Sequence, residues 1–143
     1  MKHRPPFIAT ALIEVGAGLA LIVSPALAVS ILVGGSFDTA TDTVVGRVAG
    51  AALLALALVS WLARNEEHGS AATGIVSGLL LYNAGAGAVL AYAGIGLRLS
   101  GIGLWPAVAL HVAMAVWCLA VLASSKRLAS EKDLAAPAMA KEL

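Results

Sequence analysis

The chain is poor in charged and aromatic side chains and has a single cysteine. Only 12% of its 143 residues are charged and 5% are aromatic. A soluble domain normally carries about 25% charged residues, so the composition argues against one. Cys118 alone excludes an internal disulfide and a cysteine-rich metal site. A net charge of +1 gives no basic surface for nucleic acid, and we expect no nucleic-acid partner.

Long apolar runs fill the chain instead. Hydrophobic residues make up 60% of it, and the mean hydropathy is +0.94. Four runs, at about 7–33, 44–63, 71–94 and 104–123, each reach the roughly 20 residues that cross a bilayer core. We therefore predict an all-α integral membrane protein, a four-helix bundle. Residues 1–124 form its single transmembrane domain, and residues 125–143 form a charged, alanine-rich cytoplasmic tail, frayed or disordered.

The first apolar run is longer than one membrane crossing and contains a proline. Pro25 lacks a backbone donor, so we expect a membrane helix to about Ser24 and a bent or interfacial continuation through Val33. The basic start and the small residues near Ala28 resemble a cleavable signal peptide. Glu14 inside the run, and its continuation to Val33, favour a retained first span.

The basic residues predict the orientation. Seven of the nine lysines and arginines fall on the side of the N-terminus. They are Lys2, Arg4, Arg64, Lys126, Arg127, Lys132 and Lys141, against Arg47 and Arg98 on the other side. By the positive-inside rule, both termini are cytoplasmic, N-in and C-in.

One polar side chain interrupts each span: Glu14, Arg47, Asn83 and His111. A carboxylate at the centre of a span costs about 2.5–3.5 kcal/mol on insertion scales, so it is usually neutral, paired or turned toward a cavity. Thr10, Glu14 and Gly18 share one helix face, which directs Glu14 into the bundle. Glu14 is then either a proton- or cation-binding carboxylate or a structural glutamate, protonated or paired with arginine.

Each of the other three residues has two alternative roles. Arg47 either reaches the headgroups or turns inward toward Glu14, a lipid phosphate or an anionic ligand. Asn83 is either a hydrogen-bonding contact between helices or part of a ligand site. His111 is either structural or a proton relay or ligand contact. We predict no metal site, since Cys118 and His111 are too few ligands. Together the four suggest an internal polar cluster or ligand cavity.

Glycines recur at a spacing of four residues within two spans. Gly46 and Gly50, and Gly74 and Gly78, each place two glycines on one helix face. Such faces let helix backbones approach closely in lipid. We predict that these four residues mediate helix packing, either inside the bundle or between copies of the chain.

Nearly the whole chain resembles small bacterial four-span membrane proteins of unknown function, which are DoxX-like in architecture. The resemblance rests on residues 24–25, 46–54, 61–64, 81–83 and 104–107, and on His111. It implies an N-in, C-in four-helix bundle in a bacterial inner membrane. It implies no activity and no catalytic residue.

A second resemblance is local. Residues 11–16, Ala-Leu-Ile-Glu-Val-Gly, resemble the first span of the small multidrug resistance transporters. In that family the first-span glutamate exchanges protons for lipophilic cations. The resemblance implies this role for Glu14 alone, because the later spans do not match.

The sequence thus favours a small inner-membrane protein without catalysis, either binding a lipophilic molecule or serving as an accessory subunit. The alternatives are a proton-coupled exporter that uses Glu14, and a membrane enzyme that acts on a lipid or quinone with His111 and Glu14 as acid and base. We expect membrane lipid as a partner, and a homo-oligomer or larger membrane complex as a further association. No cofactor is predicted, because the chain has no nucleotide loop, haem-binding pair or nucleophile elbow.

Overall fold

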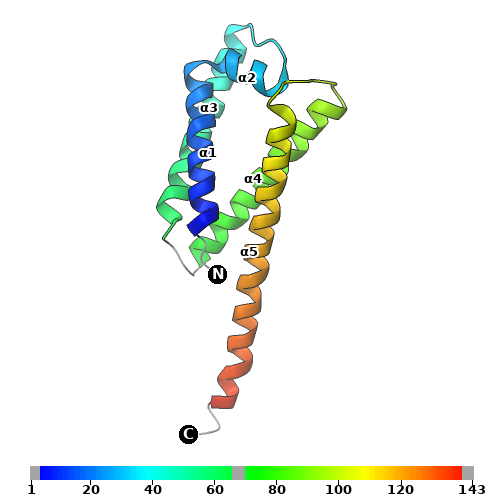
Figure 1. The fold of residues 1–143 in the computed structure, drawn as a ribbon. Coiled ribbons are helices and arrows are strands. Elements are labelled where there is room, and N and C mark those ends of the chain that lie inside the picture. Colours follow the sequence, from blue (N-terminus) through cyan, green and yellow to red (C-terminus); the bar gives the residue numbers. More distant parts are fainter. Residues whose placement is uncertain (1–3, 66–69, 140–143) are drawn as a thin grey trace.

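The computed structural model describes residues 4–65 and 70–139. Within them the chain forms five helices, α1 (Arg4–Val23), α2 (Pro25–Val33), α3 (Ala40–Ala63), α4 (Ser70–Ile95) and α5 (Leu104–Met139), as Figure 1 shows. The all-α class is confirmed. Lys2, Lys141 and residues 66–69 of the loop predicted to be cytoplasmic lie outside the described residues.

The break in the first apolar run falls at Ser24, where the proline predicts it. Ser24 has φ −144° and ψ 75°, outside the helical region, and Pro25 begins α2. A proline is well tolerated there because the first helical N–H has no partner within a helix. Gly34 ends α2 with φ 73°, a left-handed conformation that glycine adopts at little cost.

The start of α3 is fixed by a reciprocal pair of hydrogen bonds. The Asp42 backbone N–H donates to Thr39 Oγ1, and the Thr39 backbone N–H donates to Asp42 Oδ2, each over 3.0 Å. This capping box satisfies two backbone donors at the helix end. It places the start of α3 at Ala40, four residues before the predicted span.

The helices associate as two close pairs, α1 with α3 and α4 with α5 (Figure 1). The α1–α3 pair is tight because glycines face each other: a Cβ at Gly50 would lie 2.7 Å from the carbonyl oxygen of Gly18. A Cβ at Gly46 would lie equally close, 2.7 Å, to the Pro25 side chain. Gly46 and Gly50 therefore sit in packed contacts, whereas Gly74 and Gly78 are exposed and have no described neighbour within 4 Å of such a Cβ.

The two pairs meet in a small apolar core near the start of α1. Six buried residues from all four long helices form it: Phe7, Ala63, Val76, Leu79, Cys118 and Val121. Contacts between the two pairs are far fewer than contacts within each pair, and α2 adds contacts to both pairs. The Gly103 backbone N–H donates to the Ile31 carbonyl over 2.9 Å, which joins α2 to the segment before α5.

Large apolar side chains cover the outside of the bundle. Leu81 is 77% exposed and Val48 65% exposed, the reverse of a soluble protein. Three helical stretches, Ala40–Ala63, Ser70–Ile95 and Leu104–Ser125, are long and apolar enough to cross a membrane, and Phe7–Val23 is apolar but shorter. These features are those of a helical membrane protein.

The final helix extends into the tail that the sequence predicts to be either a frayed helix or disordered. α5 continues unbroken through the predicted boundary at residue 124 to Met139 and projects beyond the other helices (Figure 1). Alanine, leucine, lysine and glutamate dominate this stretch and have high helix propensity, which accounts for the continuation.

Candidate functional site

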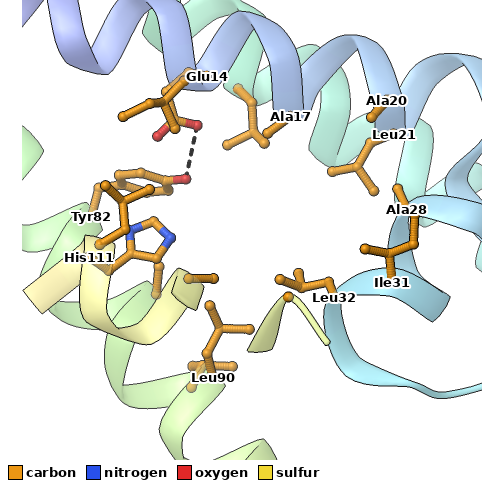
Figure 2. Close-up of a pocket in the computed structure, with 17 residues that line it drawn as sticks. Glu14, Ala17, Ala20, Leu21, Ala28, Ile31, Leu32, Tyr82, Leu90 and His111 are labelled. Atoms are coloured by element: carbon orange, nitrogen blue, oxygen red, sulfur yellow. Dashed lines mark hydrogen bonds between the residues drawn. The ribbon is translucent and has the colours of Figure 1, made fainter. Parts of the chain in front are cut away.

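A pocket of about 540 Å³ lies between the two helix pairs, at the end covered by α2. Seventeen residues line it (Figure 2), and most are aliphatic side chains, which come from all five helices. Three polar side chains reach it: Glu14, Tyr82 and His111. Figure 2 shows them together on one side, facing aliphatic residues such as Ala28 and Ile31 of α2 across the cavity.

Glu14 is held at this polar end by its position on α1. Its side chain is only 4% exposed and lies on the same face as the buried Thr10. The Tyr82 hydroxyl donates to Glu14 Oε2 over 3.1 Å, joining α1 to α4 (Figure 2). The carboxyl group therefore has one phenolic hydrogen-bond donor at the edge of a largely aliphatic pocket.

Asn83 and His111 form a second polar pair beside the first. The Asn83 side-chain amide donates to the Leu79 carbonyl over 2.8 Å, and His111 Nδ1 lies 2.9 Å from Asn83 Oδ1. A carbonyl only accepts, so the Asn83 atom facing Leu79 is nitrogen and the atom facing His111 is oxygen. His111 must then donate from Nδ1, and in the neutral ring Nε2 is left as an acceptor.

The two polar pairs touch through their rings. The rings of Tyr82 and His111 meet edge to face, with centroids 5.6 Å apart and an interplanar angle of 81°. This contact fixes both rings, because aromatic pairs favour edge-to-face geometry. Glu14, Tyr82, Asn83 and His111 thus form one cluster across three helices, called the polar cluster below.

Arg47 lies outside this cluster. Its side chain is exposed, and its Nε donates to the Ile22 carbonyl over 3.3 Å. Ile22 is in the last turn of α1, where the following Ser24 and Pro25 interrupt the helical donors. Arg47 therefore contacts the end of α1, and the structure shows no hydrogen bond or ion pair between it and Glu14. Its contact with headgroups, a lipid phosphate or an anionic ligand stays a prediction.

Two residues of the site lie beyond the sequence-based set. Tyr82 supplies the partner of Glu14, and its only sequence signal is its place next to Asn83 in the middle of a span. Thr10 is 2% exposed, and its hydroxyl has no hydrogen-bond partner among the described residues. In the sequence, Thr10 is indicated only by the helix face that it shares with Glu14.

No group of three or more histidine, cysteine, aspartate or glutamate residues is arranged for a metal within residues 4–65 and 70–139. Cys118 belongs to the apolar core and not to the polar cluster. The chemistry offered by the site is therefore that of a carboxyl group, a phenol and an imidazole acceptor at the end of an apolar pocket.

Comparisons with protein-family models, with curated proteins and with solved structures found no match to this chain. Neither the DoxX-like resemblance nor the local likeness to small multidrug resistance transporters gains support from them. Both stay predictions, and the function is argued from the site alone.

Proposed function

We propose that this protein binds a lipophilic small molecule inside the membrane and performs no catalysis. The pocket between the helix pairs carries the proposal, because it has the size and lining of a small-molecule site. Such sites hold about 300–1,000 Å³ and pair apolar walls with a few placed polar groups. The 540 Å³ pocket has aliphatic walls and one polar end.

The polar end favours a ligand that donates hydrogen bonds. His111 Nε2 is an acceptor when Nδ1 donates to Asn83, and the Glu14 carboxyl group is an acceptor when ionised. A hydroxyl or amine group on an apolar body would meet both. A ligand whose only polar group is a hydrogen-bond acceptor would give His111 Nε2 no donor and the ionised Glu14 carboxyl no donor beyond Tyr82, which is costly in an apolar site.

Binding to purified protein in lipid nanodiscs tests this. A panel of lipophilic alcohols, amines, quinones and ketones of similar size is compared by calorimetry. Alcohols or amines should bind more tightly than ketones, and Glu14→Gln and His111→Phe should weaken them by about tenfold or more, which is about 1.4 kcal/mol. If no compound binds, or if both variants bind like the parent, the ligand-binding function is wrong.

The membrane arrangement behind this proposal is four spans with both termini cytoplasmic, in a bacterial inner membrane. α1 supports the fourth span, because 20 helical residues reach about 30 Å, the thickness of the bilayer core. Cysteine labelling in a Cys118→Ala background tests the orientation. Ser100→Cys should react with an impermeant reagent from outside, and Ser70→Cys should react only after the membrane is opened.

A proton-coupled exporter is the second candidate, and the location of Glu14 favours it. A buried carboxyl group that lines a lipophilic pocket can hold either a proton or a cationic ligand. Ligand uptake into proteoliposomes under a pH gradient separates the two functions. Accumulation that is lost in Glu14→Gln indicates transport, whereas ligand binding without accumulation leaves the binding protein.

The enzyme alternative requires Glu14 and His111 at one cavity, and both line this pocket. An enzyme would convert its ligand into a product, whereas a binding protein would release the ligand unchanged. Incubation with quinone or phospholipid, followed by mass spectrometry, would reveal a product that the His111→Phe variant does not form. Unchanged ligand would leave the binding function in place.

The exposed glycine face of α4 supports an association with another helix. Gly74 and Gly78 leave open space within 4 Å where other helices would fit closely. We include a homo-oligomer or a larger membrane complex in the proposal. Crosslinking in native membranes at Gly78→Cys, with the exposed Ala88→Cys as a control on the same helix, tests it.

A further inference from the structure

A second, much smaller void adjoins the lipophilic pocket, with which it shares Ile13, Glu14, Leu110 and His111. Its volume is about 10 Å³. Four polar residues line it, Thr10, Glu14, Asn83 and His111, together with the apolar Ile13, Leu110 and Met114. By this measure a single water needs about 10–15 Å³, so the void matches one water molecule.

The unpartnered Thr10 hydroxyl indicates that a molecule occupies this void. It is buried with a residue exposure of 2%, and no described group accepts from it or donates to it. A buried hydroxyl without a partner is destabilising, so such groups in folded proteins are nearly always hydrogen-bonded, often to an ordered water. Thr10 is also the residue that lies one helical turn before Glu14, on the same face of α1.

We propose that this void binds one structural water molecule. The water accepts from the Thr10 hydroxyl and donates to the Glu14 carboxyl group and to Asn83 Oδ1. Buried waters typically make about three hydrogen bonds, which is the number offered here. Asn83 Oδ1 can serve both the water and His111, because a carbonyl oxygen has two lone pairs.

A metal cation fits the void less well. Hard cations take about six oxygen ligands, and only three side-chain oxygen groups line this space. The remaining lining of Ile13, Leu110 and Met114 offers no oxygen from a side chain. A water needs no more partners than these three residues supply.

The water gives Glu14 a second hydrogen-bond partner besides Tyr82, and it connects the two helix pairs. Thr10 and Glu14 belong to α1, Asn83 to α4 and His111 to α5. Contacts between the α1–α3 and α4–α5 pairs are far fewer than contacts within each pair. A water bonded to both sides holds the polar cluster together at the wall of the pocket, whichever lipophilic molecule the pocket takes.

A structure of the full chain in a lipidic mesophase at about 2 Å resolution tests this directly. The expected result is one density peak about 2.5–3.0 Å from Thr10 Oγ1 and within hydrogen-bond distance of Glu14. An empty void, with the Thr10 hydroxyl turned onto a backbone carbonyl, would overturn the proposal. So would a peak that vanishes when sodium is replaced by N-methylglucamine, because that peak would be a cation.

Thermal unfolding of Thr10→Val and Thr10→Ser gives an independent test, which depends on whether the Tm of Thr10→Val falls or rises. Valine keeps the shape of threonine and removes the hydroxyl. With a water in the void, Thr10→Val loses a hydrogen bond and its Tm falls. Thr10→Ser keeps the hydroxyl, so a crystal structure of that variant should still show the water peak. If the hydroxyl is an unpaired group in a dry void, Thr10→Val removes a cost and the Tm rises, which contradicts the water site. Should Thr10→Val fail to fold, the structure of the parent chain decides alone.

Discussion

The Tyr82 hydroxyl donates to Glu14 Oε2 over 3.1 Å, a hydrogen bond between α4 and α1 at the polar end of the apolar pocket. It joins two helices that belong to different packed pairs. Because the carboxyl group is 4% exposed, this bond is a principal means of keeping a polar group among aliphatic side chains.

A double-mutant cycle measures this bond. Tyr82→Phe and Glu14→Leu, which each remove the bond, should show a coupling free energy of about 0.6 kcal/mol, and no more than about 1.7, the range for hydrogen bonds between membrane helices. Unfolding in mixed detergent micelles supplies the four free energies. Tyr92→Phe is the matched control, because Tyr92 is on the same helix but 64% exposed, and its coupling to Glu14→Leu should be zero.

The tautomer of His111 follows from its neighbour. In the neutral ring, the proton should reside on Nδ1, because Asn83 Oδ1 can only accept. Nitrogen-15 NMR of labelled protein distinguishes the two tautomers, and His111→Gln assigns the signal. Asn83→Leu should remove the preference, while Ser77→Ala, at an exposed position on the same helix, should leave it intact. A proton on Nε2 in the parent chain would contradict the assigned network.

The contact between Gly18 and Gly50 predicts different effects on stability for two alanine substitutions, one at Gly50 of α3 and one at Gly16 of α1. Gly50→Ala should destabilise the fold by about 1–3 kcal/mol, because its Cβ would lie 2.7 Å from a backbone oxygen that cannot move freely. Gly16→Ala meets nothing within 4 Å and should be neutral or gain up to about 1 kcal/mol of helix propensity. Unfolding titrations of both variants test the α1–α3 packing. Equal effects would mean that the two helices do not meet there.

Arg47→Gln should lower stability only slightly, by about 0.3–1 kcal/mol, the usual value of a cation at a helix C-terminus. Its Nε contacts the end of α1 at Ile22 and not the polar cluster. Ligand affinity should therefore stay unchanged in this variant. A large loss of affinity, similar to that of Glu14→Gln, would show that Arg47 acts on the site after all.

The sequence predicts the helices well and their faces poorly. Apolar runs mark the spans, and Pro25 and Gly34 mark where α1 breaks and α2 ends. The helices are hydrophobic nearly all round, so no polar stripe shows which face points inward or which helix is the neighbour. The pairing of α1 with α3 depends on Gly18 meeting Gly50, a contact that spacing within either helix does not show.

The polar cluster was predictable only in part. A carboxyl group, an amide and an imidazole within apolar spans stand out because each is costly in lipid. Tyr82 does not stand out, since tyrosine is common near membrane interfaces and carries no charge. Arg47 was ambiguous for a different reason: a long side chain reaches either the headgroups or the interior, and only the break at Ser24 exposes the carbonyl that it contacts.

The most direct measurement of the central claim is ligand binding by two matched variants of α4. Ala86 lines the pocket, whereas Ala88 lies two residues further on, is exposed and does not line it. Ala86→Phe should fill the pocket and abolish binding of the tightest compound in the panel, and Ala88→Phe should bind it like the parent chain. Equal binding by both variants would contradict a ligand site between the helix pairs.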